Sequence, residues 1–170
     1  MTPDLIEPEA VARARACFLT DDNLYGCAET TLIVLQESYG LPDAADFSPA
    51  MALNGGVAYS GSICGALSGA AMAVGRLAGQ RIADHRQAKR TARDLVARLL
   101  AEFQAEFGAG DCRTLTGRDL SLPAEHEAFI QSGIWRERCM AQIEFVVRQL
   151  VRLHDEQVWD QTVRDLAAND

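Results

Sequence analysis

The sequence predicts an all-α protein, and three observations support this fold class. Of the 170 residues, 48% are hydrophobic and 24% are charged, the composition of a globular chain long enough to bury a core. Aromatic residues make up only 6%. Apolar positions recur at helical rather than alternating spacing. With no internal repeat or linker, we predict one domain over residues 1–170, a bundle of about five main helices around a close-packed central helix rich in glycine and alanine.

Local signals place the first helices. A helix is expected over residues 8–19, because proline is tolerated in its opening turn. A second helix should begin after residues 20–23, which are rich in capping residue types, and end before the next proline. Residues 48–54 open with Ser-Pro and close at Asn-Gly-Gly, which predicts a short helix.

Two amphipathic helices are expected in the second half of the chain. One begins at Asp84, with Gln87 placed as in a capping box, and stops at the glycines of residues 108–110. Its apolar stripe consists of Leu95, Val96, Leu99, Leu100, Phe103 and Phe107. A short helix is expected near residues 123–130, and the last one after Ser132. The stripe of the last helix consists of Ile143, Val146, Val147 and Leu150.

The central helix, expected over residues 62–79, is rich in glycine. Glycine inside a helix costs roughly 1 kcal/mol relative to alanine, so its repeated use needs a reason. Small residues recur here at helical spacing: Gly65 with Gly69, and Ala71 with Gly75 and Gly79. Such spacing allows another helix to approach closely, including one across a homodimer interface. Alternatively, the small residues around Cys64 leave room for a cofactor or a reacting partner.

Charge and composition exclude several classes. A net charge of −8 argues against a nucleic-acid-binding surface. Residues 1–9 carry acids and prolines where a signal peptide has basic residues and an apolar run. The longest apolar stretch, residues 63–75, is too short to span a bilayer, so no membrane insertion is expected. Five cysteines without an export signal indicate a reducing compartment, and we expect the protein to be cytoplasmic.

Three of four cysteines of interest lie where expected helices begin. Cys27, Cys64 and Cys139 fall in the first two turns of helices, and Cys112 follows a glycine-rich break. The positive end of a helix dipole lowers the pKa of a thiol, and Arg113 either does the same for Cys112 or is surface charge. If the two helices around residue 82 are antiparallel and the long connection before Cys64 returns along the bundle, the four thiols meet at one end.

The cysteine spacing also fits a plain structural interpretation. Free cysteine often serves as a small buried hydrophobe, so four inert core thiols are equally compatible with the pattern. No CxxC occurs, so neither a zinc knuckle nor a thioredoxin-type motif is indicated. No CxxCH occurs either, which means that no haem attachment motif is present.

Three motifs and a further cysteine favour a functional set of cysteines over inert core thiols. They are Gly-Cys-Ala-Glu at 26–29, Cys-Gly-Ala-Leu-Ser-Gly at 64–69, Cys-Arg-Thr-Leu-Thr-Gly at 112–117, and Cys139. Together they resemble the C_GCAxxG_C_C family of redox-active proteins over about residues 20–150. The chain is also similar to the N-terminal domain of split-Soret cytochromes, without their haem-binding portion. The resemblance implies that Cys27, Cys64, Cys112 and Cys139 act as one redox-active set, whereas Cys17 lies outside it as a packing residue.

Two mechanisms are compatible with such a set. In the one we favour, Cys27, Cys64, Cys112 and Cys139 are metal or cofactor ligands that hold an iron–sulfur cluster, because four cysteines ligate both [2Fe–2S] and [4Fe–4S] clusters. The protein would then transfer electrons to a redox partner protein. In the other, pairs of thiols cycle between dithiol and disulfide without a metal. A structural zinc site ranks lower, because closely spaced cysteine pairs are missing.

A third interpretation belongs to a different class of protein. The chain is then a non-enzymatic helical adaptor with incidental cysteines, which binds a protein partner through an exposed C-terminal stretch around Trp159. His85, His126 and His154 stand in charged helical contexts typical of solvated histidines, so a hydrolase is not indicated. Neither the electron donor or acceptor nor the oligomeric state follows from the sequence.

Overall fold

Helices build the part of the chain that the structure describes. The structure, a computed structural model, describes residues 3–168. The α-helices are α1 (Pro3–Phe18), α2 (Cys27–Ser38), α3 (Gly65–Arg81), α4 (His85–Phe107), α5 (Cys112–Thr116), α6 (Pro123–Ser132), α7 (Arg138–Val151) and α8 (Glu156–Ala168). The 3-10 helices are η1 (Ser48–Leu53), η2 (Ile134–Arg136) and η3 (Arg152–His154). Within residues 3–168 the only β-type pairing is an isolated antiparallel bridge between Ile63 and Asp111.

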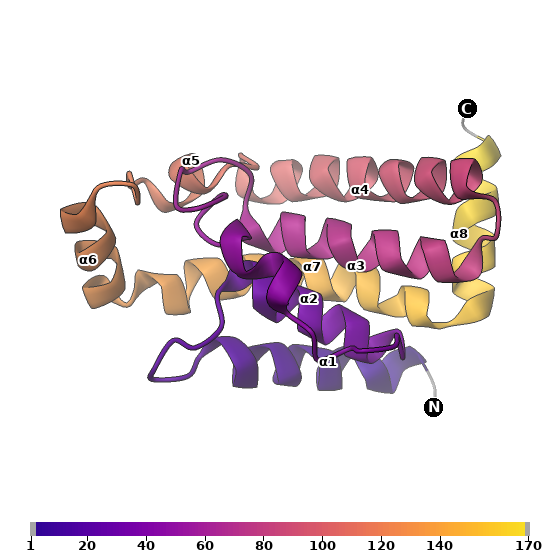
Figure 1. Cartoon of the computed structure of the whole chain (residues 1–170), viewed down its shortest axis with the longest axis horizontal. Coiled ribbons are helices and arrows are strands. Elements are labelled where there is room, and N and C mark those ends of the chain that lie inside the picture. The colour runs from indigo at the N-terminus through magenta and orange to yellow at the C-terminus, as the bar shows by residue number, and fades with distance from the viewer. Residues whose placement is uncertain (1–2, 169–170) are drawn as a thin grey trace.

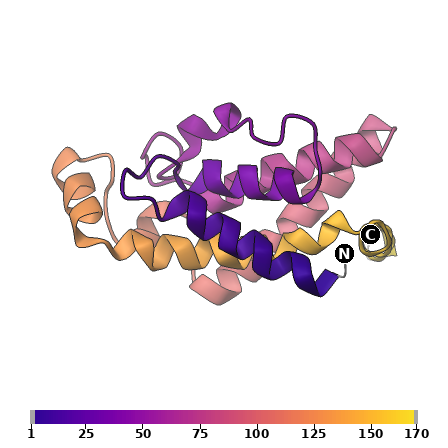
Figure 2. The same cartoon turned by 90° about the horizontal axis from the view of Figure 1, so that it is seen from below.

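These elements form a single all-α domain, as predicted, and α3 is its central helix. It packs against α2, α4 and α7, while α1 covers α2 and α7. Figure 1 shows α3 and α4 side by side as an antiparallel hairpin, with α8 across one end of the bundle. Figure 2, seen from below, places α6 at the end opposite α8. The predicted domain also includes residues 1, 2, 169 and 170, which lie outside the described residues.

The prediction of about five main helices is wrong, because local signals divide the chain further. The helix expected after Ser132 is interrupted at Gly133, whose φ of 68° ends α6. A 3-10 turn follows, and α7 begins only at Arg138. Asp155 then caps α8, since its carboxylate accepts hydrogen bonds from two backbone N–H groups of that helix. The short α5 adds a further helix, and α1 begins earlier than expected.

Trp159 itself is buried, although many of its neighbours in α8 are exposed, which corrects the aromatic basis of the adaptor interpretation. Trp159 is 4% exposed and packs in the core as part of α8. The Arg81 guanidinium lies 5.3 Å from the centre of its ring and donates a hydrogen bond to the carbonyl of Leu153. This face of α8 is therefore already covered by the bundle itself.

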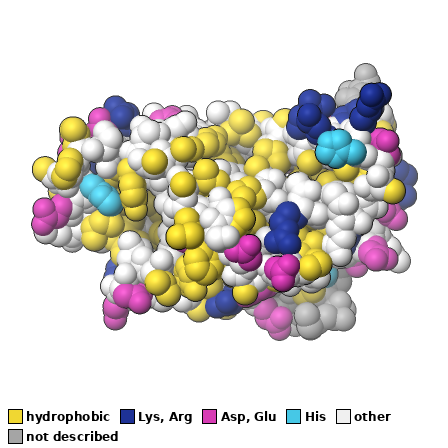
Figure 3. Space-filling view, viewed as in Figure 1, with side chains coloured by type: hydrophobic (Ala, Val, Ile, Leu, Met, Phe, Trp, Pro, Cys, Tyr) yellow, Lys and Arg dark blue, Asp and Glu magenta, His cyan; other side chains and the backbone are white. Residues whose placement is uncertain are grey.

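Polar and apolar surface are distributed unevenly. Figure 3 shows hydrophobic side chains over much of one face, whereas Lys and Arg gather where α4 begins. Among the described residues, six large hydrophobic side chains are exposed: Leu24, Met51, Val57, Tyr59, Leu122 and Ile130. In residues 3–168, no helix combines the length and the apolar character that a membrane crossing requires.

Candidate functional site

The four cysteines of the motif set all stand where helices begin. Cys27 is the first residue of α2, and Cys64 is the N-cap of α3. Cys112 opens α5, a helix that the sequence did not predict, and Cys139 is the second residue of α7. Because these helices start at one end of the bundle, the cysteines come from positions far apart in the sequence to one region.

A short backbone pairing holds Cys64 beside Cys112. The Cys64 N–H donates to the carbonyl of Gly110 at 2.9 Å, and the Cys112 N–H donates to the carbonyl of Ser62 at 2.7 Å. These bonds flank the isolated bridge between the segments before α3 and α5. The chain therefore returns along α4 to the start of α3, where these backbone hydrogen bonds hold Cys112 next to Cys64.

Cys27 lies at the centre of the set. A Cβ added at Gly65 would lie 2.3 Å from the Cys27 sulfur, so the thiol fills the space that this glycine leaves open. Negative charge on Cys27 raises the pKa of Cys64, Cys112 and Cys139 alike. All three thiols are therefore within electrostatic reach of Cys27.

Cys17 is not part of this group. It is buried on α1, and the charged groups that act on it are Arg13 and Glu37. Its position matches the predicted packing residue.

Three of the four thiols line one apolar pocket. The cavity has a volume of about 70 Å³. Cys27, Cys112 and Cys139 contribute to its wall, while Cys64 is buried outside it, with its thiol 3.5 Å from the Gln142 amide oxygen. The apolar part of the wall consists of Phe18, Leu120, Phe129, Ile130 and Trp135.

The pKa values of the four thiols are raised, against the expectation from their helix N-termini. Burial raises the pKa of Cys112 to about 12 and also raises the pKa values of Cys64 and Cys139 well above the usual range. Backbone N–H groups, including that of Gly65, point at the Cys27 sulfur and lower its pKa, but burial outweighs them and the net shift is upward. The thiols are therefore protonated near neutral pH.

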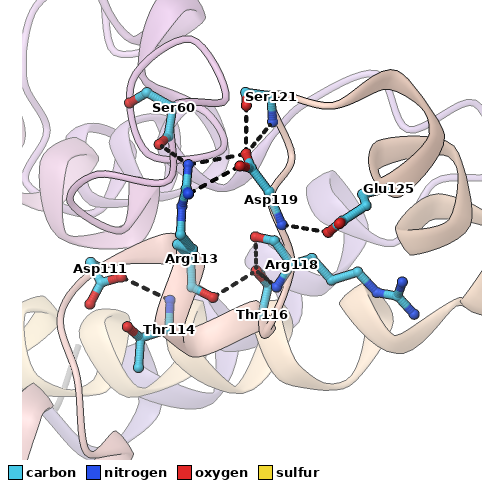
Figure 4. Close-up of polar contacts among 9 residues, drawn as sticks. All are labelled: Ser60, Asp111, Arg113, Thr114, Thr116, Arg118, Asp119, Ser121 and Glu125. Carbon is cyan, nitrogen blue, oxygen red and sulfur yellow. Dashed lines mark hydrogen bonds and ion pairs between the residues drawn. The ribbon is translucent and has the colours of Figure 1, made fainter.

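Arg113 does not activate Cys112, which corrects one of the two roles considered for it. Its guanidinium pairs with Asp119 at 3.0 Å and donates to the carbonyl of Ser60 at 3.3 Å (Figure 4). The Asp119 N–H in turn donates to Glu125 at 2.7 Å. Arg113 thus joins the loop before α3 to the loop before α6.

Asn54 is a site residue that sequence reasoning missed. Its amide oxygen accepts a hydrogen bond from the Ala28 N–H at 3.0 Å, and its amide nitrogen donates to Glu29 at 2.8 Å. A Cβ at Gly26 would lie 2.2 Å from the Asn54 side chain, which explains the glycine before Cys27. Asn54 lies in the glycine-rich segment before Cys64, yet only the fold places it against α2.

Tyr59 and His126 were also missed, and both line the cysteine pocket. Their ring centres lie 4.5 Å apart. His126 is half-buried on α6, so the expectation of a solvated histidine is wrong for this residue. Charge on its two acidic neighbours in the sequence suggested solvent exposure, but α6 carries His126 to the pocket wall beside Tyr59.

The fit of a metal to this site can be judged from its donors. Four thiols are suitable donors for iron or zinc. Within residues 3–168, however, no group of three or more His, Cys, Asp or Glu side chains is placed to hold a metal ion. All five cysteines are free thiols. The arrangement as it stands does not fit a bound metal, and the ligand role of the four cysteines stays a prediction.

Comparison with known proteins places the chain in a family. No curated protein and no solved structure matches it. The similarity to split-Soret cytochromes therefore stays a prediction. The family described as "Putative redox-active protein (C_GCAxxG_C_C)" matches residues 25–153, close to the predicted span of about 20–150. This match covers most of the chain and all four clustered cysteines, and the protein belongs to the C_GCAxxG_C_C family.

Proposed function

We propose that the protein is a thiol redox protein in which two cysteines of the pocket cycle between dithiol and disulfide. One observation carries this proposal: Cys27, Cys112 and Cys139, from three helices, line a single pocket as free thiols. A dithiol needs only two such neighbours: the central Cys27 is one of them, and Cys112 and Cys139 are alternative partners for it. Of the four redox candidates assigned from the sequence, Cys27, Cys112 and Cys139 are the reacting thiols of this proposal, and Cys64 is their buried neighbour.

The reaction is an exchange with a disulfide of another molecule. One thiol loses its proton, and the resulting thiolate attacks a sulfur of the partner disulfide, forming a mixed disulfide and releasing one partner thiol. A second thiol of the pocket then attacks the mixed disulfide, closing a disulfide within this chain and releasing the second partner thiol. Two thiols here are oxidised and one partner disulfide is reduced, so electrons and protons balance.

Apolar surface beside the pocket suits a protein partner. Tyr59 and Ile130 are exposed, and both also line the pocket. Leu24 follows the pocket residue Asn23 directly in the sequence and is 61% exposed. Contiguous exposed apolar surface is typical of interaction sites. We include in the proposal a redox partner protein that docks here, in the reducing environment of the cytoplasm.

Ligation of an iron–sulfur cluster is the second candidate. The electrostatic repulsion between the thiolates favours it. A thiolate at Cys27 raises the pKa of the other three thiols, and a cation among them would relieve this repulsion. Cys27, Cys64, Cys112 and Cys139 would be the ligands, and the group would supply electron transfer. Their sulfurs would have to move into a common coordination geometry, which is why this candidate ranks below thiol exchange.

Metal analysis and intact mass separate the candidates. The protein is purified without oxygen, and iron, zinc and acid-labile sulfide are measured together with the visible spectrum. It is then treated with oxidised glutathione, and its intact mass is measured. A metal-free protein that loses two hydrogens and regains them with a reductant supports the thiol proposal. Iron and sulfide in simple ratio, with colour bleached by dithionite, would replace it by the cluster.

Cysteine variants provide the matched controls. Cys27→Ser removes the central thiol and is expected to abolish the reversible mass change. Cys17→Ser removes a buried thiol outside the set and should leave that change intact. A protein without metal or reversible disulfide, whose Cys27→Ser variant behaves as the parent, would instead support the adaptor interpretation.

A further inference from the structure

We propose that His126 accepts the proton of the attacking thiol in the cysteine pocket, and that Tyr59 positions it. This inference rests on the proposed thiol chemistry and adds to it a residue outside the cysteine motifs. His126 lies on α6, and Tyr59 lies in the loop before α3, so two separate segments bring the pair to the wall that Cys27, Cys112 and Cys139 share.

Tyr59 holds the imidazole by direct ring contact. The two ring planes are tilted by 40° at a centre distance of 4.5 Å. The Tyr59 ring also packs closely against Gly55, where an added Cβ would lie 2.3 Å from the ring carbon Cδ1. Burial raises the pKa of Tyr59, and negative charge on Cys27 and Glu29 raises it further, so the hydroxyl is within electrostatic reach of the central thiol.

The loop that carries Tyr59 has an unusual backbone. Val57, Ala58 and Tyr59 have φ values of 61°, 51° and 59°, in the left-handed region that non-glycine residues rarely occupy. Such residues are conformationally strained and cluster at functional sites. Three consecutive examples, ending at the residue that stacks on His126, indicate that the surrounding structure enforces this ring position.

A polar network fixes the two segments relative to each other. Arg113 binds the carbonyl of Ser60, the residue after Tyr59, and also binds Asp119. The N–H of Asp119 donates to Glu125, the residue before His126 (Figure 4). The neighbours of both aromatic residues are thus tied through one guanidinium and one aspartate.

The chemistry of the pocket needs a proton acceptor. Burial keeps the thiols protonated near neutral pH, yet only the thiolate attacks a disulfide. A cavity of about 70 Å³ has room for bridging water between the thiols and the imidazole. A ring nitrogen of His126 takes the proton as the new S–S bond begins to form, and returns it to the thiolate that leaves the partner disulfide.

The test measures thiol–disulfide exchange of the full chain with the aromatic disulfide DTNB, whose released thiolate is coloured. His126→Gln is expected to lower the rate about 10²-fold. His126→Ala should be equally slow and should recover when imidazole is added to the buffer, a rescue that a merely structural role would not produce. Tyr59→Leu removes the ring that contacts His126 and should also be slow.

The matched control is His85→Gln, which changes an exposed histidine at the start of α4. Circular dichroism verifies that every variant is folded. The proposed role of His126 is overturned if His126→Gln reacts at the parental rate, or if imidazole does not raise the slow rate of His126→Ala. Either outcome leaves the proposed function in place. If the parent protein keeps the DTNB thiol as a mixed disulfide and forms no internal disulfide, its intact mass will show this. That outcome would overturn both the proposed function and this inference.

Discussion

The two halves of α3 use the same kind of glycine pattern for different purposes. In the first half, a Cβ at Gly69 would lie 2.3 Å from the carbonyl oxygen of Ala28, and one at Gly65 equally close to the Cys27 sulfur. In the second half, added Cβ atoms at Gly75 and Gly79 meet nothing within 4 Å. Sequence spacing alone therefore does not distinguish a glycine that a close contact requires from one that only lowers helix propensity.

The helix caps at the two ends of this region differ in a similar way. Near Cys27, the cap of α2 comes from Asn54, a residue remote in sequence. At the other end of α3, the following helix α4 is capped locally, because the Asp84 carboxylate accepts from the Gln87 N–H at 2.8 Å. The α2 cap from Asn54 therefore joins two segments, whereas the α4 cap from Asp84 lies within one segment.

The largest effect is expected for Gly69→Ala. The added methyl group would collide with the backbone of α2, which cannot move aside as a flexible side chain can, so we expect a loss of about 3 kcal/mol in the free energy of unfolding. Chemical denaturation measures it. An unchanged midpoint would mean that α2 and α3 are not in close contact at this position.

The two caps give the next prediction. Asn54→Ala removes an acceptor for the α2 backbone and a donor to Glu29, and should lower the free energy of unfolding by about 2 kcal/mol. Asp84→Ala removes one exposed cap and should cost about 1 kcal/mol. Urea titrations of both variants compare the two losses in the free energy of unfolding. Equal losses would contradict the expectation that the α2 cap, which joins two segments, contributes more than the local cap of α4.

Alkaline pH should destabilise the cysteine end. The pKa of Cys112 is raised to about 12 in the folded protein, so the folded state retains a proton that the unfolded chain has already released. Its contribution is complete below the unfolded pKa of about 8.5 and is lost as the pH rises towards the folded value.

The stability of the parent and of Cys112→Ser, measured in reductant, isolates this single thiol. Above about pH 9, the free energy of unfolding of the parent should fall more steeply than that of the variant, by about 1.4 kcal/mol per pH unit. Parallel curves for the two proteins would show that the Cys112 thiol titrates normally in the fold.

The smallest effect has the opposite sign. Gly75→Ala adds a methyl group where no neighbour lies within 4 Å, and should stabilise α3 by roughly 0.5–1 kcal/mol through higher helix propensity. Thermal unfolding measures the gain, and gel filtration of the same sample follows the oligomeric state. Destabilisation together with a smaller assembly would instead indicate that this half of α3 packs against a second copy in a homodimer.

Much of the fold followed from local patterns. The stripe of α4 predicted an inward face, and Leu95, Leu99 and Phe103 are buried. The capping signal at Asp84 placed the start of that helix correctly. The break at Gly133 and the short α5 were missed, because a positive φ at one glycine and a five-residue helix leave little periodic signal.

The candidate site, like the fold, could be predicted only in part from the sequence. Its cysteines could be named from the sequence, since they recur at helix starts and match a family pattern. Asn54, Tyr59 and His126 could not, because each reaches the pocket through contacts with segments distant in the chain. Nor did helix position predict the direction of the thiol pKa shifts, which depends on how deeply the folded protein buries each sulfur.

The amino-acid sequence by itself determined the helical class, the stripes that face the core, and the identity of the four clustered cysteines. These properties depend on residue type and on spacing within one segment. Only the tertiary structure decided which thiols share a pocket, that their pKa values rise, and that a tyrosine and a histidine complete its wall. Burial and ring contacts depend on segments far apart in sequence, whose proximity exists only once the helices have packed.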